Sequence, residues 1–524
     1  MSIKIYSEAD SDKKIFKGVE LMAKTVGSTM GPGGRLVAIT MNGATRFTKD
    51  GVTVAKAISS DDAAERVGMD ALRQVAMKTC DTQGDGTTTS TVLAAGLFNL
   101  AKKLQSKSEQ DITREIVRSM DKIKDSSLEY IKNNSLKITT NSADIEKVAS
   151  ISTNGDLELI AMIGQAYRAT GENCEIEIKR AFERCSSVSV NNGASYDRGM
   201  ISQLFANDKD RRSCFLDNPY VLLYEGTLST AKEVSEVIKG LNNQDSLLII
   251  CSDVIGEART ALVGASRNIS GNYCAINAPN FGLARIDAMR DLAVMTGGDY
   301  IESEKGLSLR SIGREANLGR IKSAKIGLSK TVLVSGRKMD DEEITERAKF
   351  IQKDIDSSTS KEMKDKHRTR LANFKQSIAT IHLGAETDAE YEEKFDRLED
   401  AIGACRAAVS GGVVKGGGTT MFEAYKEILS SNKTDYIDHT LAIALSHPLF
   451  MILDNAHIPK ENVSQYLSGK LGKKAGYNAR TGVIVEDMNE IGIVDPADVV
   501  SAAIINAVSA AKLLLSTNSI ITLE

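Results

Sequence analysis

The sequence predicts a multidomain fold that is mainly α-helical, with an α/β block in the middle, a pattern compatible with an α/β domain inserted into a helical one. The chain has 524 residues, which is room for about three domains. Near both ends, apolar residues recur at three- and four-residue steps, as they do in amphipathic helices. In the middle, apolar runs of strand length alternate with helical stretches, which is typical of an α/β fold.

The N-terminal part begins with a helix predicted over residues 10–30, where apolar residues from Ile15 to Val26 share one face. The segment "GSTMGPGG" contains glycine and proline and ends this helix. The runs "RLVAITM" and "TRFTKDG", joined by Asn42-Gly43, predict a β-hairpin. Further helices are expected as far as about residue 134.

The middle of the chain contains a short strand, "CEIEIK", and then the strand-length runs "YVLLYEG", "SLLIICSD" and "YCAINAP". Helical stretches at 230–240 and 256–268 separate these runs. Residues 338–375 are highly charged but keep an apolar stripe, so solvated helices are predicted there instead of a disordered tail. Residues 385–524 are again mostly helical, so a helical domain built from both termini is compatible with the pattern.

Composition excludes several classes of function. The net charge is -4, Trp is absent and aromatic residues make up 5%, so neither nucleic acid nor a membrane is expected as a partner. The seven Cys form no CxxC pair and the five His show no zinc spacing. No run of about 18 apolar residues and no signal sequence is found, which predicts a cytoplasmic protein without a membrane span.

The segment "DTQGDGTTTS" (81–90) lies where a helix is predicted to begin, near Thr87–Thr89. Free N–H groups at a helix start bind anions, and Gly84 and Gly86 let a ligand approach the backbone, so phosphate fits. Asp85 would repel phosphate unless a cation such as Mg²⁺ lies between them. The alternative is that Asp85 only caps the helix.

Three further segments favour a nucleotide site. "TMGPGG" (29–34) is a glycine loop at a helix end, "TKDG" (48–51) places Lys49 and Asp50 at a loop tip, and "GGVVKGGGTT" (411–420) opens another helix. The P-loop pattern GxxxxGK[ST] is absent, so the sequence does not predict an ordinary P-loop.

Together these segments resemble the group I chaperonins, the GroEL type. The resemblance extends over nearly the whole chain and includes "TMGPGG", "TKDGVTVAKAI", "GDGTTTSTVLA", "YDRGMIS", "EDAIGACRAAVSGGVVKGGG", "GYNARTG" and "GIVDPADV", in the family's order. It implies an equatorial ATP-binding and ring-forming domain at 1–134 and 411–524, an intermediate hinge domain at 135–190 and 377–410, and an apical polypeptide-binding domain at 191–376.

The resemblance also implies the roles of individual residues. Asp85 would bind Mg²⁺, and Asp50 and Asp400 would orient and activate the attacking water as the catalytic acids. Thr29, Lys49 and Thr88 lie where the family can also bind K⁺. The implied ATP-binding positions are Thr29, Met30, Gly31, Pro32, Lys49, Asp85, Gly86, Thr87, Thr88, Thr89, Gly417, Asn478, Ala479, Ile493 and Asp495. Asp400 would reach the nucleotide when its small domain swings down.

The resemblance places polypeptide binding on the inserted domain, at Met200, Ser202, Leu204, Phe205, Val234, Val237, Arg259, Val263 and Gly264. Exposed apolar groups are expected there, because unfolded clients share only exposed hydrophobic area. By helical spacing alone, Val234 and Val237 would belong to a core. Arg259 and Gly264 stand where the family usually has apolar residues, which suggests a divergent member, such as a phage-encoded one.

The implied function is ATP-driven folding of non-native polypeptides inside a seven-membered ring, with a co-chaperonin as a further partner. Phe450 and Pro459 stand where the family commonly has a charged pair between rings, so a single ring is an alternative to a double one. An alternative function is a ring-shaped holdase or scaffold without a productive ATP cycle. An ordinary small-molecule kinase is disfavoured, because no acceptor pocket is evident in the sequence.

Overall fold

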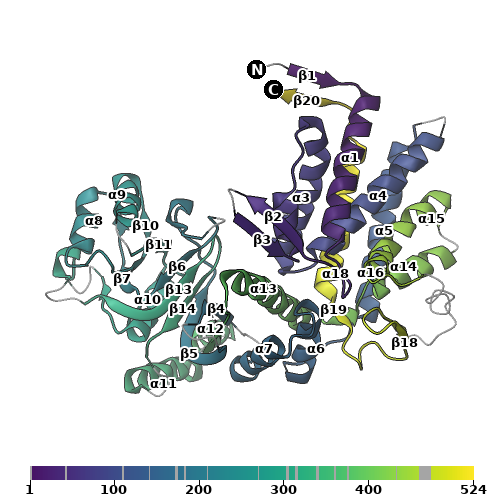
Figure 1. Ribbon diagram of the computed structural model, residues 1–524. Coiled ribbons are helices and arrows are strands. Elements are labelled where there is room, and N and C mark those ends of the chain that lie inside the picture. Colours follow the sequence, from purple (N-terminus) through teal and green to yellow (C-terminus); the bar gives the residue numbers. More distant parts are fainter. Residues whose placement is uncertain are drawn as a thin grey trace. The chain divides into compact units, whose positions relative to one another are not determined.

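Figure 1 shows the computed structural model of the protein. The structure describes residues 3–41, 44–108, 111–140, 142–171, 175–181, 185–208, 211–268, 271–302, 306–312, 317–337, 341–358, 361–374, 377–431, 434–459 and 474–523.

The chain divides into two compact units. Unit 1 comprises residues 1–168, 180–187 and 383–524, and unit 2 comprises residues 169–179 and 188–382. Unit 1 therefore contains both termini and unit 2 is inserted into it, as predicted. A separate intermediate domain stays a prediction, because helices α6 (Ser142–Ser152) and α13 (Asp388–Gly411) both belong to unit 1 and pack against each other there.

Unit 1 is mainly helical. Its helices are α1 (Glu8–Gly27), α2 (Gly51–Ala57), α3 (Ala63–Gln83), α4 (Thr87–Lys107), α5 (Thr113–Asn134), α6, α7 (Leu157–Thr170), α13, α14 (Thr419–Ser430), α15 (Tyr436–Ala442), the 3₁₀ helix η4 (Ile443–Ser446), α16 (His447–Asn455) and α18 (Ala497–Leu515). Its strands are β1 (Ile3–Tyr6), β2 (Val37–Met41), β3 (Ala44–Thr48), β16 (Val413–Lys415), β17 (Gly476–Asn478), β18 (Val483–Val485), β19 (Val494–Pro496) and β20 (Ile520–Leu523).

The core of unit 1 forms where α1, α3, α4 and α18 pack on one another. The α1 residues Ile15, Val19, Met22 and Val26 are fully buried, which confirms the predicted apolar face. The face predicted for α4 is also confirmed at Leu93, Leu97 and Leu104. Strands β2 and β3 pair antiparallel as the predicted hairpin, although Asn42 and Gly43 lie outside the described residues.

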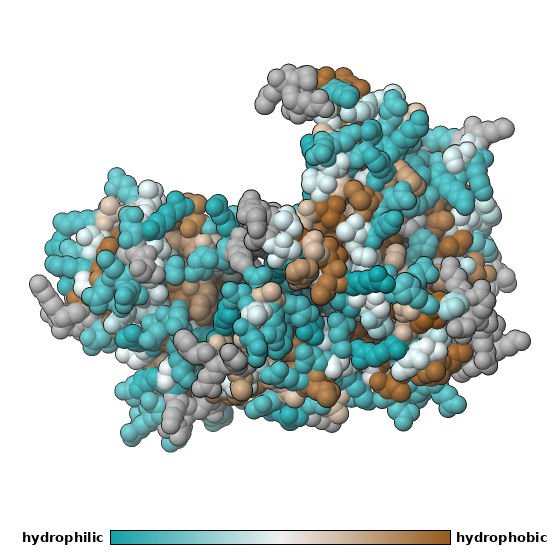
Figure 2. All heavy atoms as spheres, viewed as in Figure 1, coloured by the Kyte–Doolittle hydropathy of each residue, from teal (hydrophilic) through white to brown (hydrophobic). Residues whose placement is uncertain are grey.

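The two ends of the chain meet in a two-stranded ribbon. Strands β1 and β20 pair antiparallel, with Ile5 opposite Ile521, and Figure 1 shows the ribbon projecting beyond α1. Ile3, Ile5 and Ile521 are each about two-thirds exposed, at 67%, 69% and 67%. Figure 2 shows apolar surface at this ribbon.

Unit 2 is built on a sheet. Its strands are β4 (Glu175–Arg180), β5 (Ser187–Tyr196), β6 (Cys214–Asp217), β7 (Tyr220–Tyr224), β8 (Thr227–Leu228), β9 (Leu247–Cys251), β10 (Asp253–Val254), β11 (Tyr273–Asn277), β12 (Tyr300–Ile301), β13 (Gly319–Ile326), β14 (Thr331–Ser335) and β15 (Ser377–Leu383). Its helices are η1 (Gln203–Phe205), α8 (Ala231–Ile238), α9 (Gly256–Arg267), α10 (Leu283–Thr296), η3 (Leu309–Ser311), α11 (Glu342–Ser357) and α12 (Lys361–Phe374).

The main sheet of unit 2 has the order β11-β9-β7-β13-β14-β5-β15-β4. Strands β7, β9 and β11 are parallel, and α8 and α9 lie between them in sequence, so the predicted α/β alternation is confirmed. All five residues of β9 are buried, as expected for a central parallel strand covered on both faces. The charged helix α11 buries its predicted stripe, Ile344, Ala348, Ile351 and Ile355.

Two described segments are long and apolar enough to cross a membrane by length and composition, Tyr436–Asn455 and Ala497–Leu515. More than half of each, 56% and 61%, is buried inside the protein. A mostly buried core helix passes the same test, so these segments are weak evidence for a membrane span.

Candidate functional site

The structure places the start of α4 at Thr87, as predicted. Helix α3 ends at Gln83, and Gly84 and Gly86 both take positive φ angles, 75° and 86°, which glycine adopts without strain. The Asp85 carboxylate accepts hydrogen bonds from the Gly86 N–H at 2.5 Å and from the Ser152 hydroxyl at 3.0 Å. The N-cap of α4 is Gly86, without any side-chain cap. Asp85 is therefore not the helix cap, which was the alternative interpretation.

The start of α2 lies against the start of α4. A Cβ atom added to Gly51 would lie only 2.4 Å from the Thr88 hydroxyl oxygen, so only glycine allows this approach. Asp50 caps α2 by accepting from the backbone N–H groups of Val52 and Thr53, at 3.0 and 2.7 Å. Its carboxylate has lone pairs to spare, because two oxygens offer about four acceptor positions.

The end of α1 forms a second wall. Gly31 has a φ of 76°, and its carbonyl accepts a 2.9 Å hydrogen bond from the Lys49 ammonium group. The Asn455 side-chain amide donates to the carbonyls of Gly27 and Met30, at 2.8 and 2.9 Å. These bonds hold the glycine loop and bring Lys49 beside it.

The third glycine cluster opens α14. Gly417 and Gly418 have φ angles of 63° and 76°, and Gly418 is the N-cap. Strand β16 pairs with β19, which sets Val414 opposite Asp495. The Asp495 carboxylate accepts from the Gly417 N–H. A carboxylate thus stands where this glycine turn begins.

These four segments surround one cavity of about 390 Å³, within the size range of small-molecule sites. All the predicted ATP-binding and catalytic residues line it: Thr29, Met30, Gly31, Pro32, Lys49, Asp50, Asp85, Gly86, Thr87, Thr88, Thr89, Asp400, Gly417, Asn478, Ala479, Ile493 and Asp495. The helix starts of α4 and α14 both contribute, which provides backbone N–H groups suited to an anion.

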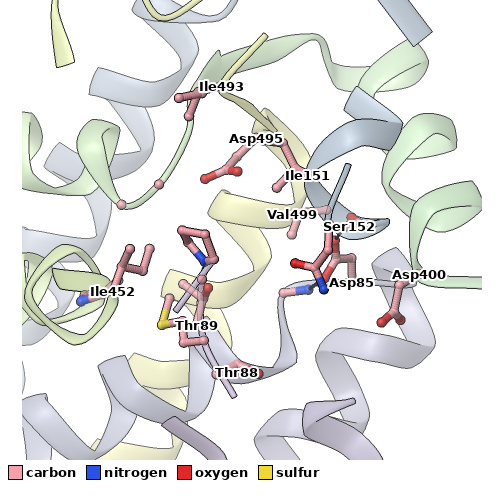
Figure 3. A pocket seen from close by; sticks show the side chains of 18 of the residues that line it. Asp85, Thr88, Thr89, Ile151, Ser152, Asp400, Ile452, Ile493, Asp495 and Val499 are labelled. Carbon is pink, nitrogen blue, oxygen red and sulfur yellow. Dashed lines mark hydrogen bonds between the residues drawn. The ribbon is translucent and has the colours of Figure 1, made fainter. Parts of the chain in front are cut away.

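Asp50, Asp85 and Asp400 are three of the carboxylates that line this cavity. Burial raises the pKa of Asp85, and the charge of Asp50 adds to the rise. Burial also raises the pKa of Asp400 well above its usual range, with Asp85 and Asp50 as further causes. Figure 3 shows Asp85 and Asp400 near each other on one side of the pocket, with Ser152. Such clustered acids favour a cation between them.

The donor set fits Mg²⁺ only together with phosphate oxygens. Among the described residues no group of three or more His, Cys, Asp or Glu side chains could hold a metal alone. Mg²⁺ commonly takes one or two carboxylates and completes its shell with water and substrate phosphates. One ligand from Asp85, beside a helix start suited to phosphate, matches that arrangement.

The predicted K⁺ site is less well supplied by side chains. The Thr29 hydroxyl already donates to the Val26 carbonyl at 2.8 Å, although its lone pairs remain. Burial lowers the pKa of Lys49, and Arg397 and Arg480 add to the effect. A Lys ammonium group has no lone pair, so Lys49 could serve K⁺ only through its backbone carbonyl.

The predicted adenine slot lies beside Asp495. Asn478 uses its side-chain oxygen within a turn, accepting from the N–H groups of Arg480 and Thr481 at 3.0 and 3.3 Å. Ala479 packs against the small apolar cluster that contains Ile452. Figure 3 shows Ile493 and Asp495 at one end of the pocket.

Sequence reasoning missed several lining residues. The C-terminal turn of α6 contributes Ile151 and Ser152, and α13 contributes Asp396 and Arg397 beside Asp400. Neither helix carries a glycine turn or other local signal for a ligand. The i and i+4 spacing of Asp396 and Asp400 puts both on one helix face, which is the one pattern that could have revealed Asp396.

The expected exposure of the polypeptide-binding residues is wrong for five of them. Met200, Phe205, Val234, Val237 and Val263 are 0% to 8% exposed and belong to the core of unit 2. Amphipathic helix spacing explains this, because α8 and α9 pack on each other through their apolar faces. Leu204 is 59% exposed, and Ser202, Arg259 and Gly264 are partly exposed.

The positions that bear on ring contacts have local partners or are exposed. Phe450 packs edge-on against Phe422, with 6.3 Å between ring centroids. Pro459 is exposed. No cross-ring role is visible in a single chain.

Comparisons with known proteins identify the family and the fold. The model of the TCP-1/cpn60 chaperonin family matches residues 22–524. Crystal structures of the chaperonin gp146 from the bacteriophage EL 2 (Pseudomonas aeruginosa), in presence of ATP-BeFx, are similar in fold. Crystal form II gives a TM-score of 0.67 and crystal form I gives 0.64, each at 21% identity over 99% of both chains.

Proposed function

The chain belongs to the TCP-1/cpn60 chaperonin family, and on this premise we propose that it is an ATP-dependent molecular chaperone. It captures non-native polypeptides and promotes their folding inside a ring cavity, driven by Mg-ATP hydrolysis. The observation that carries the proposal is the convergence of the glycine turns and Asp50, Asp85 and Asp400 on one cavity.

The nucleotide is held by backbone groups more than by side chains. The N-termini of α4 and α14, with the hydroxyls of Thr87–Thr89, receive phosphate oxygens, and Asp495 accepts from the ribose hydroxyls. Asp85 holds Mg²⁺. Mg²⁺ held by Asp85 would supply neutralisation of phosphate charge, which phosphoryl transfer requires.

Hydrolysis then needs an oriented water molecule. Asp50 is fixed by its capping hydrogen bonds, and Asp400 lines the same cavity from α13. The raised pKa of Asp400 would fall when cations enter, since its causes are burial and neighbouring negative charge. The ionised carboxylate is then able to accept a proton from water.

Client capture requires exposed apolar surface on unit 2. Leu204 remains the exposed apolar member of the predicted set. Phe281 and Leu283, at the start of α10, are 72% and 82% exposed and were not selected from the sequence. These side chains are the better candidates for first contact with a client.

Self-association into a ring is proposed through unit 1. The β1–β20 ribbon presents three exposed isoleucines on strands whose outer edges have no partner in the described chain. Exposed edges of this kind pair readily with another chain. A seven-membered ring, single or double, and a co-chaperonin partner stay proposals by family resemblance.

The decisive experiment is ATP turnover by wild type and Asp400→Ala. Loss of the carboxylate should slow turnover by about a hundredfold or more, within the range of general-base effects, while nucleotide binding stays within about threefold. Phosphate release and equilibrium binding of a fluorescent ATP analogue measure the two quantities.

Glu399→Ala is the matched control, because Glu399 is the exposed neighbour on α13 and does not line the cavity. It should keep turnover near wild type. Equal turnover by Asp400→Ala and wild type would remove Asp400 from the reaction. A wild type that suppresses client aggregation but hydrolyses no ATP would favour the holdase alternative.

A further inference from the structure

Ion pairs connect helix α13 to the β2–β3 hairpin. The Arg46 Nη2 atom lies 2.7 Å from the Asp396 Oδ2 atom, and the Thr48 hydroxyl donates to the same oxygen at 3.3 Å. The Arg46 Nε atom lies 3.5 Å from the Glu392 Oε2 atom, one turn earlier on α13. One arginine thus engages two successive turns of the helix.

The ion pair with Asp396 holds the turn of α13 that directly precedes Asp400. Asp396 and Asp400 are four residues apart, so they lie on the same face of α13, and both line the cavity. Arg46 itself does not line it. The hairpin continues directly into Lys49 and Asp50, so the same segment that supplies these cavity residues also holds the helix that supplies Asp400.

The Arg46–Asp396 ion pair is partly shielded from solvent, so it can help to hold α13 in place. The two side chains are only 32% and 18% exposed. Bonds between charged partners are stronger than neutral ones, and partial burial limits their screening by water and salt. An exposed surface pair of the same length would contribute little.

A second anchor holds α13 from another direction. Arg397 donates to the Thr153 carbonyl at 3.1 Å and lies 3.5 Å from Asp156, in the segment between α6 and α7. Because this anchor ties α13 to the segment between α6 and α7, it does not hold the helix against the hairpin. The contacts of Arg46 supply that link.

We propose that Arg46 is a positioning residue for ATP hydrolysis: its ion pair with Asp396, supported by Glu392, holds the turn of α13 that presents Asp400 to the nucleotide cavity. This inference rests on the proposed ATPase function. It assigns no contact between Arg46 and the nucleotide.

The test separates positioning from binding. Arg46→Ala should lower kcat by about tenfold, which corresponds to about 1.4 kcal/mol, while the Kd for a fluorescent ATP analogue changes less than twofold. Arg46→Lys keeps one charge-assisted bond and should recover most of the loss. Arg114→Ala, on the exposed side of α5, serves as the control and should match wild type.

A double-mutant cycle tests the partner. If Asp396 acts through Arg46, Asp396→Asn and Arg46→Ala together should be no slower than the slower single variant. Additive losses would instead show that Asp396 acts on the nucleotide directly and would overturn the pairing. Turnover by Arg46→Ala at the wild-type rate would also overturn it.

Hydrogen exchange decides the question without turnover. Arg46→Ala should raise the amide exchange rates of α13 residues 392–400 relative to wild type and Arg114→Ala, with α4 unchanged. Unchanged exchange in α13 would refute the positioning role even if the protein proves to have no ATPase activity. A wild type without ATPase activity whose α13 still loosens in Arg46→Ala would refute the proposed function and keep the contact.

Discussion

At the scale of single residues, the cavity concentrates carboxyl groups whose ionisation is disfavoured. Asp495 illustrates this, because burial raises its pKa to about 7, with the charge of Asp85 as a second cause and the Gly417 N–H as an opposing one. In the unfolded chain the same carboxyl ionises near pH 4. The folded protein without nucleotide therefore holds a proton that the unfolded chain has already released.

The sign of the pH effect follows. As pH rises from about 4 to 7, the unfolded chain gains stability from ionising Asp495 and the folded protein does not, so the free energy of unfolding falls. Asp495→Asn removes this difference. Its advantage over wild type should therefore grow by about 3 kcal/mol between pH 5 and pH 8.

Thermal unfolding of both nucleotide-free proteins across that range measures the difference. The control is Asp356→Asn on α11, because Asp356 is exposed to solvent. Asp435 would not serve, because its side chain caps α15. A constant difference between Asp495→Asn and wild type at all pH values would contradict the assignment.

The sequence was most informative where backbone geometry itself demands a residue type. Glycine turns at 31, 84, 86 and 417 mark the cavity, because a ligand site built on helix starts needs a close approach of the backbone. Ser152 and Asp396 gave no such signal, since their place depends on how α6 and α13 pack. Val234 and Val237 show the reverse case: a spacing that fits a binding surface also fits a core.

At the scale of elements, the contact between α3 and α13 depends on two glycines. A Cβ atom on Gly403 would lie 2.8 Å from the Gly84 Cα atom, and the obstructing atom belongs to the backbone and cannot rotate away. The loop that carries Asp85 and the helix that carries Asp400 are therefore closer than ordinary side chains would permit.

Replacement of this glycine gives a prediction of sign. Within a helix, Gly to Ala normally stabilises by about 1 kcal/mol, through lower chain entropy. Gly403→Ala should instead lower the free energy of unfolding, by roughly 1–3 kcal/mol, because overpacking separates two elements. It should also slow ATP turnover.

Gly264→Ala in α9 is the matched helical variant, because an added Cβ there meets no atom within 4 Å. It should be neutral or stabilising. Calorimetric unfolding compares the free energy of unfolding of the two variants. A Gly403→Ala variant more stable than wild type would contradict the prediction, because it would show that α13 can move away from Gly84 without loss of stability.

At the scale of the whole molecule, the β1–β20 ribbon exposes one apolar face and buries the other against the core of unit 1. Ile3 and Ile5 share a face of β1, and Ile521 lies opposite Ile5 on β20, while Thr522 on the alternate face is buried. Exposed isoleucines on a two-stranded ribbon are unfavourable in water, which supports the proposed self-association through this face.

Ile5→Lys should therefore weaken self-association. The charge would have to be buried or expelled at the contact, so the large species should shift toward monomer in sedimentation velocity. Leu157→Lys at the start of α7 is the control, since Leu157 is 81% exposed in unit 1. Equal sedimentation of Ile5→Lys and wild type would place the subunit contact elsewhere, and runs with and without ATP would distinguish single from double rings.

The order of helical and strand-bearing parts could be predicted because apolar period distinguishes helices from strands over long stretches, whereas the insertion of one unit into the other was only compatible with that pattern and was implied by the resemblance. The limits of the predicted intermediate domain could not be predicted from this pattern, because the sequences of α6 and α13 do not show which other helices they pack against.

The two ends of the longer segment of unit 2, residues 188–382, lie side by side. Strands β5 and β15 run at its boundary, and the Ser189 hydroxyl and the His382 Nε2 atom are 3.2 Å apart. A linker of a few residues could therefore join position 188 to position 382, but β4, in the shorter segment 169–179, would then lose its partner β15. A fragment of unit 2 meant to stand alone must therefore begin before β4 and end after β15, and relatives can exchange this domain only with both of its segments together.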